Sequence, residues 1–352
     1  MVNNKTYSLE NHNHMKSIFI ITIPLFLVVL ISSVTFGSVY IPFSATIRIM
    51  MQKFFRIGDL KGISESYTVI TLMVRLPRVL LSALVGASLS ISGAAMQGLL
   101  KNPLADGSTL GVASGASLGA VFMIATGFSL PFVPQLGITA ISIIFAFLSL
   151  LIILTLSYKI DYNLTTNTII LTGVIFSMFV SSVVSLVIAL SGEELRQIIF
   201  WSMGSFSGRG WDYIYIMLPF FVIGGCGLFY YARELDAFAL GEEQAHYIGV
   251  DTKKVKLGIL IYTSVLIGAS VSVSGNIAFV GLVIPHITRM LTGPSHRTLL
   301  MFSALIGAIF MMLTDLLSRM VMSPVELPIG IVTSFIGSII FVYIFYSQRK
   351  KN

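Results

Sequence analysis

Stretches without a single charged side chain recur along this sequence from one end to the other. A helix needs about 20 apolar residues to cross the hydrocarbon of a bilayer, and most of these stretches reach that length. They are too long for strands and lack the two-residue alternation of a barrel strand. Only 11% of the 352 residues are charged, against about 25% in soluble domains. The sequence therefore predicts an all-α polytopic membrane protein. The uncharged stretches are residues 17–47, 79–100, 107–158, 162–192, 213–232, 257–288, 298–314 and 327–348.

Glycine and proline breaks divide the two longest stretches. Pro131 and Pro134 interrupt the stretch that ends at residue 158, and Gly275-Asn276 interrupts the one that ends at residue 288. The resulting pattern predicts about ten transmembrane helices, and an even number places both termini on the same side of the membrane. The predicted helices are residues 17–36, 79–100, 107–128, 136–158, 167–190, 211–230, 257–274, 277–291, 298–318 and 327–347.

Basic residues at the two ends indicate the orientation. Lys5 and Lys16 precede the first apolar stretch and Arg349-Lys350-Lys351 follows the last, so the positive-inside rule places both termini in the cytoplasm. The net charge of +7 fits anionic lipid headgroups better than nucleic acid, because the basic residues lie between and beyond the apolar stretches. We expect a cytoplasmic tail (1–16), a transmembrane domain (17–348) with an external segment at about 37–74 and a cytoplasmic one at about 233–256, and a basic tail (349–352).

The cytoplasmic segment 233–256 is the most polar internal part of the chain. It reads RELDAFALGEEQAHYIGVDTKKVK. Leu240-Gly241-Glu242, followed by Ala245 and Gly249, predicts two short helices hinged at glycine, which would lie on the membrane surface and insert into a groove of a partner. The alternative is an ordinary solvated loop.

Three further patterns allow both a structural and a functional interpretation. Gly111, Gly115 and Gly119 recur every four residues, which favours close helix packing. The alternative interpretation is that these small residues line a transport pathway. Arg75, Arg78 and Arg319 lie near the predicted outer helix ends. They can extend toward headgroups or bind carboxylates of an external partner. Arg319 can also pair with Asp315, four residues earlier on the same helix.

The sequence lacks the motifs of several other functions. There is no GxxxxGK[ST] phosphate loop, so the chain is not expected to hydrolyse nucleotide, and no cluster of residues suggests a catalytic or metal site. With a single cysteine, Cys226, no disulfide can form within the chain. An ion-coupled carrier needs ionisable groups at membrane depth, and the candidates reduce to Asp315 and His286. The driving force is therefore expected to come from a partner, with an ion-coupled secondary transporter as the alternative.

Four motifs in order resemble one known family. RLPRVLLSALVGASLSISGAAMQGLLKNPLADGSTLGVASGASLGA (75–120), ALGEEQAHYIGV (239–250), NIAFVGLVIPHITRMLTGPSHRTLL (276–300) and ELPIGIVTSFIGSIIFVYI (326–344) are similar to segments of the FecCD-type permeases of iron-siderophore, haem and vitamin B12 ABC importers, which are type II importers. The resemblance runs from about residue 20 to the C-terminus. It implies the fold of the vitamin B12 importer permease, with ten helices per subunit, in the bacterial cytoplasmic membrane.

The resemblance also implies roles for individual residues. The arginines would dock an extracytoplasmic binding protein, the hinge in the cytoplasmic segment would couple to the ATPase, and two turns would gate the inner mouth of the pathway. Asn167 stands where relatives often have a small hydroxyl residue. The implied docking residues are Arg75, Arg78 and Arg319, the coupling residues Leu240, Gly241, Glu242 and Glu243, and the gate residues Asn102, Leu104, Thr166 and Asn167.

The same resemblance implies a set of partners. It predicts two ATPase subunits that use ATP and magnesium, a binding protein that delivers the cargo, and a second permease copy or paralogue to complete a dimer. This chain itself would be a transport subunit, with no catalytic residue and no bound cofactor or metal. The expected cargo is an iron(III)-siderophore complex, and haem or vitamin B12 are the alternatives within the family.

Overall fold

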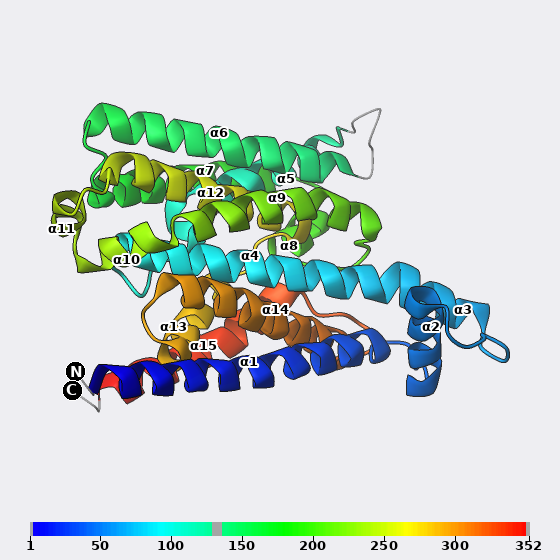
Figure 1. Ribbon diagram of the computed structural model, residues 1–352. Coiled ribbons are helices and arrows are strands. Elements are labelled where there is room, and N and C mark those ends of the chain that lie inside the picture. Colours follow the sequence, from blue (N-terminus) through cyan, green and yellow to red (C-terminus); the bar gives the residue numbers. More distant parts are fainter. Residues whose placement is uncertain (1–2, 129–135, 350–352) are drawn as a thin grey trace.

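The computed structural model describes residues 3–128 and 136–349, and the secondary structure of these residues is helical (Figure 1). Seven helical stretches of the described residues are long and apolar enough to cross a membrane. The long helices are α1 (Asn3–Thr35), α4 (Leu76–Leu100), α6 (Gly137–Ile160), α7 (Thr166–Leu190), α9 (Trp211–Tyr230), α12 (Thr252–Ser274) and α14 (His296–Met320). Three further apolar helices of the described residues are α5 (Val112–Thr126), α13 (Val280–Thr292) and α15 (Ile329–Arg349), of which the stretch 329–344 is the apolar part. The total of ten membrane helices stays a prediction.

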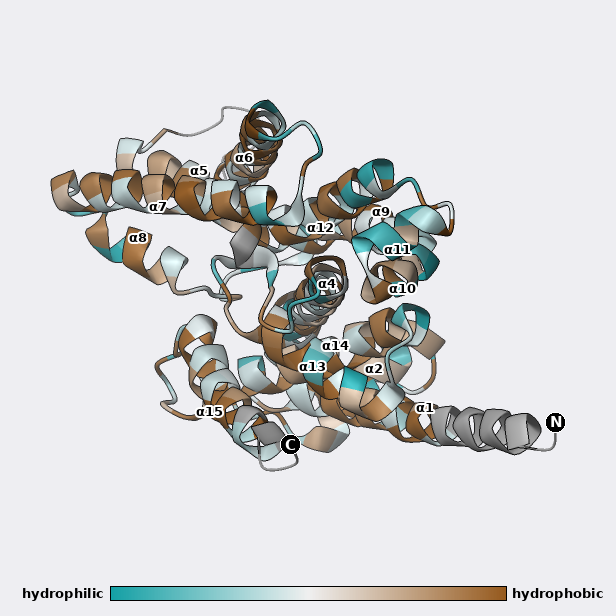
Figure 2. Ribbon diagram, turned by 90° about the vertical axis from the view of Figure 1, so that its left-hand side faces the viewer, coloured by the Kyte–Doolittle hydropathy of each residue, from teal (hydrophilic) through white to brown (hydrophobic). Residues whose placement is uncertain are grey.

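The remaining elements are short and lie mainly at the two ends of the bundle. α2 (Phe43–Phe55) and α3 (Glu65–Val69) lie at one end, whereas α10 (Ala232–Leu240) and α11 (Glu242–Tyr247) lie at the other (Figure 1). Hydrophilic residues gather on α10 and α11, and most of the long helices are hydrophobic (Figure 2). The other short elements are the π-helical turn η1 (Ile70–Arg75), the 3-10 turn η2 (Gly107–Leu110) and α8 (Leu195–Ser202).

The helix α4 runs through the middle of the bundle. Of its 25 residues 21 are buried, against 4 of the 25 residues of α7. Glycines allow its neighbours to approach closely: a Cβ at Gly93 would lie 1.8 Å from the carbonyl oxygen of Gly281 in α13, and one at Gly86 would lie 2.3 Å from that of Gly307 in α14. Backbone contact at this distance is possible only without side chains. The α4 position therefore depends on these glycines.

The first half of the chain departs from the predicted boundaries at two points. The predicted helix 79–100 instead belongs to a helical stretch that begins at Glu65 and continues through α3, η1 and α4. Pro77 has no N–H to donate and its ring displaces the carbonyl one turn earlier, and the wider π-helical turn η1 directly precedes α4. The stretch therefore continues through Pro77 instead of beginning after it. The helix α8 was not predicted.

Gly111 is a second correction. The predicted helix is present as α5, but its predicted start at residue 107 is wrong, because η2 ends at Leu110 and Gly111 has a left-handed backbone (φ 73°) before α5 begins. Gly111 therefore turns the chain and does not share a helix face with the other two glycines. Gly115 and Gly119 do pack on α6: a Cβ would lie 1.8 Å from Ser149 Oγ and 2.9 Å from Phe145 Cβ, respectively.

The two predicted breaks have different outcomes. α12 ends at Ser274 and α13 begins at Val280, so the break at Gly275-Asn276 is confirmed. Pro131 and Pro134 lie outside the described residues. On either side of them α5 ends at Thr126 and α6 begins at Gly137.

Candidate functional site

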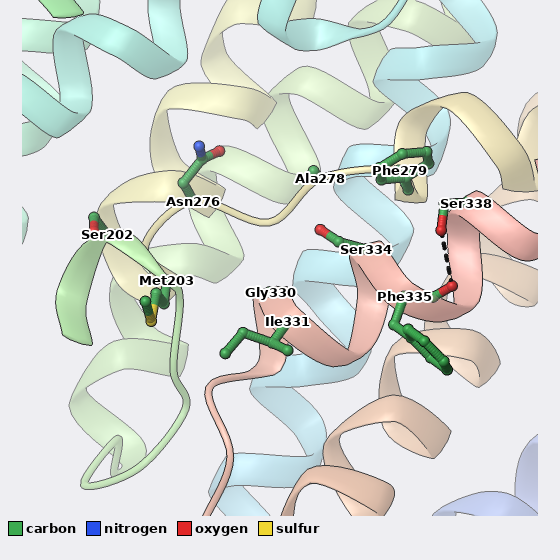
Figure 3. Close-up of a pocket in the computed structure, with 10 residues that line it drawn as sticks. All are labelled: Ser202, Met203, Asn276, Ala278, Phe279, Gly330, Ile331, Ser334, Phe335 and Ser338. Carbon is green, nitrogen blue, oxygen red and sulfur yellow. Dashed lines mark hydrogen bonds between the residues drawn. The ribbon is translucent and has the colours of Figure 1, made fainter. Parts of the chain in front are cut away.

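A cavity of about 630 Å³ opens between three segments that lie far apart in the sequence (Figure 3). The end of α8, the connection between α12 and α13, and the first half of α15 form its walls. All of its lining side chains are uncharged, and they combine hydroxyl, amide, thioether and aromatic groups. The cavity can therefore hold a large ligand through weak contacts. The lining residues are Ser202, Met203, Asn276, Ala278, Phe279, Gly330, Ile331, Ser334, Phe335 and Ser338.

Backbone hydrogen bonds fix the three walls to one another. The Gly330 N–H donates to the Met203 carbonyl at 3.0 Å, and the Ser205 N–H donates to the Ser274 carbonyl at 2.7 Å. A Cβ at Gly330 would lie 2.3 Å from the Met203 oxygen. Gly275 (φ 75°) turns the chain as it leaves α12. The start of α15 and the end of α12 are thus both attached to the segment that follows α8.

Phe279 has an uncommon backbone conformation beside this cavity. It precedes α13 with a φ of 70°, a left-handed conformation that costs a non-glycine residue about 1–2 kcal/mol. Its ring lies at the rim of the cavity, beside α15 (Figure 3), and Gly337 of α15 leaves it room, since a Cβ there would lie 2.5 Å from Phe279 Cβ. Such strain is typical of functional positions.

These lining residues were not predicted as a site. The break at Gly275-Asn276 and the segment that begins at Glu326 were recognised separately in the sequence. Their convergence depends on tertiary packing, since Met203 and Gly330 are 127 positions apart (330 − 203). A helix break inside an apolar stretch was the available signal, because irregular backbone at membrane depth tends to line a cavity.

The three predicted docking arginines lie together and are buried. Arg78 donates to Asp315 at 2.9 Å and to both carboxylate oxygens of Glu326 at 2.9 Å. Arg319 contacts Asp315 at 3.1 Å, which confirms the predicted pairing four residues apart. Asp315 is fully buried, so its charge depends on these two arginines.

Arg75 and Arg319 also bind the end of α1. Arg319 donates to the carbonyls of Ser33 and Phe36 at 2.9 and 3.0 Å, and Arg75 donates to those of Thr35 and Val39. The last carbonyls of a helix lack intrahelical partners and favour positive charge. The arginines therefore stabilise the exit of α1, and docking of a binding protein stays a prediction.

The predicted coupling segment consists of two short helices with Gly241 between them. Gly241 has a φ of 140°, and a Cβ there would lie 1.7 Å from Gln244 Oε1. Leu240 is 68% exposed, Tyr247 is 84% exposed, and Glu243 is also exposed. A polar hinge with exposed apolar side chains suits a protein partner.

The predicted gate residues occupy two separate turns. Asn102 and Leu104 lie in the exposed turn after α4, where the Asn102 side chain accepts a hydrogen bond from the Leu104 N–H at 2.9 Å. Thr166 and Asn167 are the first two residues of α7. Just before them, Asp161 accepts hydrogen bonds from the backbone N–H groups of Thr165 and Asn163. Both turns are shaped by local side-chain capping.

Comparisons with known proteins agree with this architecture. The model of the FecCD transport family matches residues 25–347. The chain is 45% identical over 338 residues to an uncharacterized ABC transporter permease protein of Bacillus subtilis (strain 168), covering 96% of each chain. It is 40% identical to a cobalamin import system permease protein of Halobacterium salinarum, covering 82% of this chain and 77% of that one.

One solved structure is similar over nearly the whole chain. It is an inward-facing conformation of a putative metal-chelate type ABC transporter, with a TM-score of 0.81 and 31% identity, covering 94% of this chain and 99% of that chain. In this family ATP hydrolysis is performed by a separate subunit. The chain belongs to the FecCD transport family and is an integral-membrane permease subunit of an ABC importer.

Proposed function

We propose that this permease imports iron(III)-siderophore complexes across a bacterial cytoplasmic membrane. An extracytoplasmic binding protein would deliver the complex, and a second permease copy or paralogue would complete the pathway. Two ATPase subunits would supply the driving force with ATP and magnesium, and this chain would bind no cofactor. Both termini would lie in the cytoplasm, on the side of α10 and α11. The family assignment argues against an ion-coupled secondary transporter.

The uncharged cavity is the observation that carries this proposal. A large chelate needs a wide passage whose contacts are weak enough for release, and the cavity walls offer hydroxyl, amide and aromatic groups without a fixed charge. Among the relatives are permeases named for Fe(3+)-citrate and iron(3+)-hydroxamate import. Others are named for hemin and cobalamin, so haem and vitamin B12 are the second candidates.

We place the docking of the binding protein at the arginine cluster. Arg75, Arg78 and Arg319 carry three positive charges against the two negative charges of Asp315 and Glu326, so the cluster has an excess positive charge. The Glu326 side chain is 27% exposed, whereas that of Asp315 is fully buried. A carboxylate of the binding protein would therefore compete with Glu326 for Arg78.

At the opposite end, α10 and α11 would insert into the ATPase subunits. Leu240 and Glu243 are available for such contacts because both are exposed, and Gly241 sets the angle between the two helices. The turns around Asn102 and Thr166 would form the inner gate, since they lie at the ends of α4 and α7 that are close to this segment.

The proposal is tested by uptake of labelled iron in a strain that lacks only this gene. Catecholate, hydroxamate and carboxylate siderophores are supplied in turn, with haem and labelled vitamin B12 alongside. Loss of one siderophore class, restored by the gene, supports the proposal, and loss of only haem or vitamin B12 uptake selects that alternative. Normal uptake of all five cargoes contradicts the proposed cargo.

Two substitutions connect that assay to the cavity. Ser334→Trp fills the cavity and should abolish uptake while the protein still accumulates in the membrane. Leu151→Trp is the matched control, because Leu151 is 60% exposed on the outer face of α6 and should leave uptake unchanged. Full uptake by Ser334→Trp would show that cargo does not pass this cavity.

A further inference from the structure

Lys256 is a buried lysine whose ammonium group joins two distant segments. Its side chain is 1% exposed, and Nζ lies 2.6 Å from Glu242 Oε1 and 2.8 Å from the Leu164 carbonyl oxygen. Glu242 is the first residue of α11, and Leu164 lies in the connection between α6 and α7. One ammonium group therefore binds both the coupling segment and the turn before α7.

Because Lys256 is buried, its charge needs a partner inside the protein. A lysine is almost never fully buried unless its charge is paired, and removing one partner of a buried pair leaves an uncompensated charge. Here Glu242 supplies the negative charge and Leu164 supplies an acceptor for a second N–H. Any movement that separates α11 from the Leu164 turn must therefore break a contact to the buried ammonium group of Lys256.

The turn that Lys256 binds is also held by other contacts. Leu164 has a left-handed backbone (φ 51°), a conformation that surrounding contacts must impose on a leucine. Lys253 donates to the Tyr162 carbonyl at 2.9 Å and lies 3.8 Å from the centre of the Tyr162 ring. Asp161 accepts the two backbone hydrogen bonds described above. Several contacts therefore join this turn to the start of α7 and to α12.

The other end of α12 reaches the cavity. α12 ends at Ser274, whose carbonyl accepts a hydrogen bond from the N–H of Ser205, two residues after the lining residue Met203. Lys256 thus belongs to a helix that connects the coupling segment with the cavity. Its neighbour Lys254 pairs with Asp251 at the helix start, and its side chain is 84% exposed.

We propose that Lys256 is the positioning residue that carries movement of the coupling helices to the start of α7. The inference rests on the proposed coupling of α10 and α11 to an ATPase. When the ATPase displaces α11, Glu242 would move the shared ammonium group and, with it, the Leu164 carbonyl. The predicted gate residues Thr166 and Asn167 directly follow that turn.

The test measures the movement of the turn before α7 in the assembled complex of permease and ATPase subunits. The permease and its ATPase subunits are reconstituted in nanodiscs, with Cys226→Ala as background and a spin label on Asn163→Cys, an exposed position in the turn. The change in the label's spectrum between the nucleotide-free and the vanadate-trapped state reports movement of the turn. Lys256→Met keeps the length and removes the charge, Lys256→Arg keeps the charge, and Lys254→Met is the matched control.

We expect Lys256→Met to reduce the ATP-dependent spectral change about tenfold, since residues in a coupling network alter coupling by roughly that factor, while ATP hydrolysis persists. Lys256→Arg should restore the change, and Lys254→Met should leave it unchanged. If Lys256 had a purely structural role, Lys256→Met would lower the stability of the permease, and ATP hydrolysis and the movement of the turn would decrease together. A wild-type response in Lys256→Met overturns the inference.

A second variant keeps the test decisive if Lys256→Met does not fold. Glu242→Gln alters the partly exposed partner, and a wild-type spectral change in this variant also overturns the inference. Failure of the proposed function looks different: the wild-type permease would bind no ATPase subunit, and its label would not respond to ATP at all.

Discussion

Asp315 is expected to be the most sensitive single position of the arginine cluster. Asp315→Asn removes the fully buried negative charge of the cluster and leaves the buried Arg78 and Arg319 without the carboxylate that they share. Breaking a buried ion pair in this way costs about 3–5 kcal/mol. Glu326→Gln is the matched control, because its side chain is 27% exposed and Arg78 keeps Asp315. That change should cost about 1 kcal/mol, as for an exposed pair.

Thermal denaturation of the purified permease in detergent measures the difference. The fraction that stays monodisperse after heating is compared for the wild type, Asp315→Asn and Glu326→Gln. We expect Asp315→Asn to melt far below Glu326→Gln, or to fail to accumulate in the membrane. Equal melting temperatures for the two variants would refute the reasoning, because they would mean that solvent screens both carboxylates alike.

Two further predictions concern α4 and the turn before α7. Gly93→Ala should strongly destabilise the protein, since its Cβ would lie 1.8 Å from the Gly281 oxygen. Gly225→Ala, whose Cβ would meet nothing within 4 Å, should stabilise the fold by about 0.5–1 kcal/mol. The melting temperatures of both variants in detergent check this, and equal changes in melting temperature would contradict it. Hydrogen bonds from Thr165 and Asn163 lower the pKa of Asp161 from 3.8 to about 2. The stability that these hydrogen bonds give to the turn is therefore fully present above about pH 4 and is lost as the pH falls toward 2. A spin label at Asn163 should report an ordered turn from pH 8 to pH 5 in the wild type and a more mobile turn over the same pH range in Asp161→Asn. A wild-type turn that becomes mobile between pH 8 and pH 5 would contradict the lowered pKa of Asp161.

Much of the architecture follows from local sequence features. Charge-free stretches of membrane length predicted helices, and the break at Gly275-Asn276 was confirmed. The pairing of Arg319 with Asp315 followed from helical spacing alone. Boundaries were less accurate where backbone geometry departs from the regular helix: the π-helical turn before Pro77 extends one stretch, and the left-handed Gly111 shortens another.

The long-range contacts could not be predicted in the same way. Apolar side chains contribute to membrane insertion wherever they stand in a helix, so composition determines that a stretch crosses the membrane but not which helices meet. Only the tertiary structure brings Arg78 to Asp315, joins Glu242 to Leu164 through Lys256, and closes three segments around the cavity. The sequence alone thus determined a helical membrane protein and its family resemblance. Packing decided which charges are buried, because burial depends on the neighbouring helices and not on the residue itself.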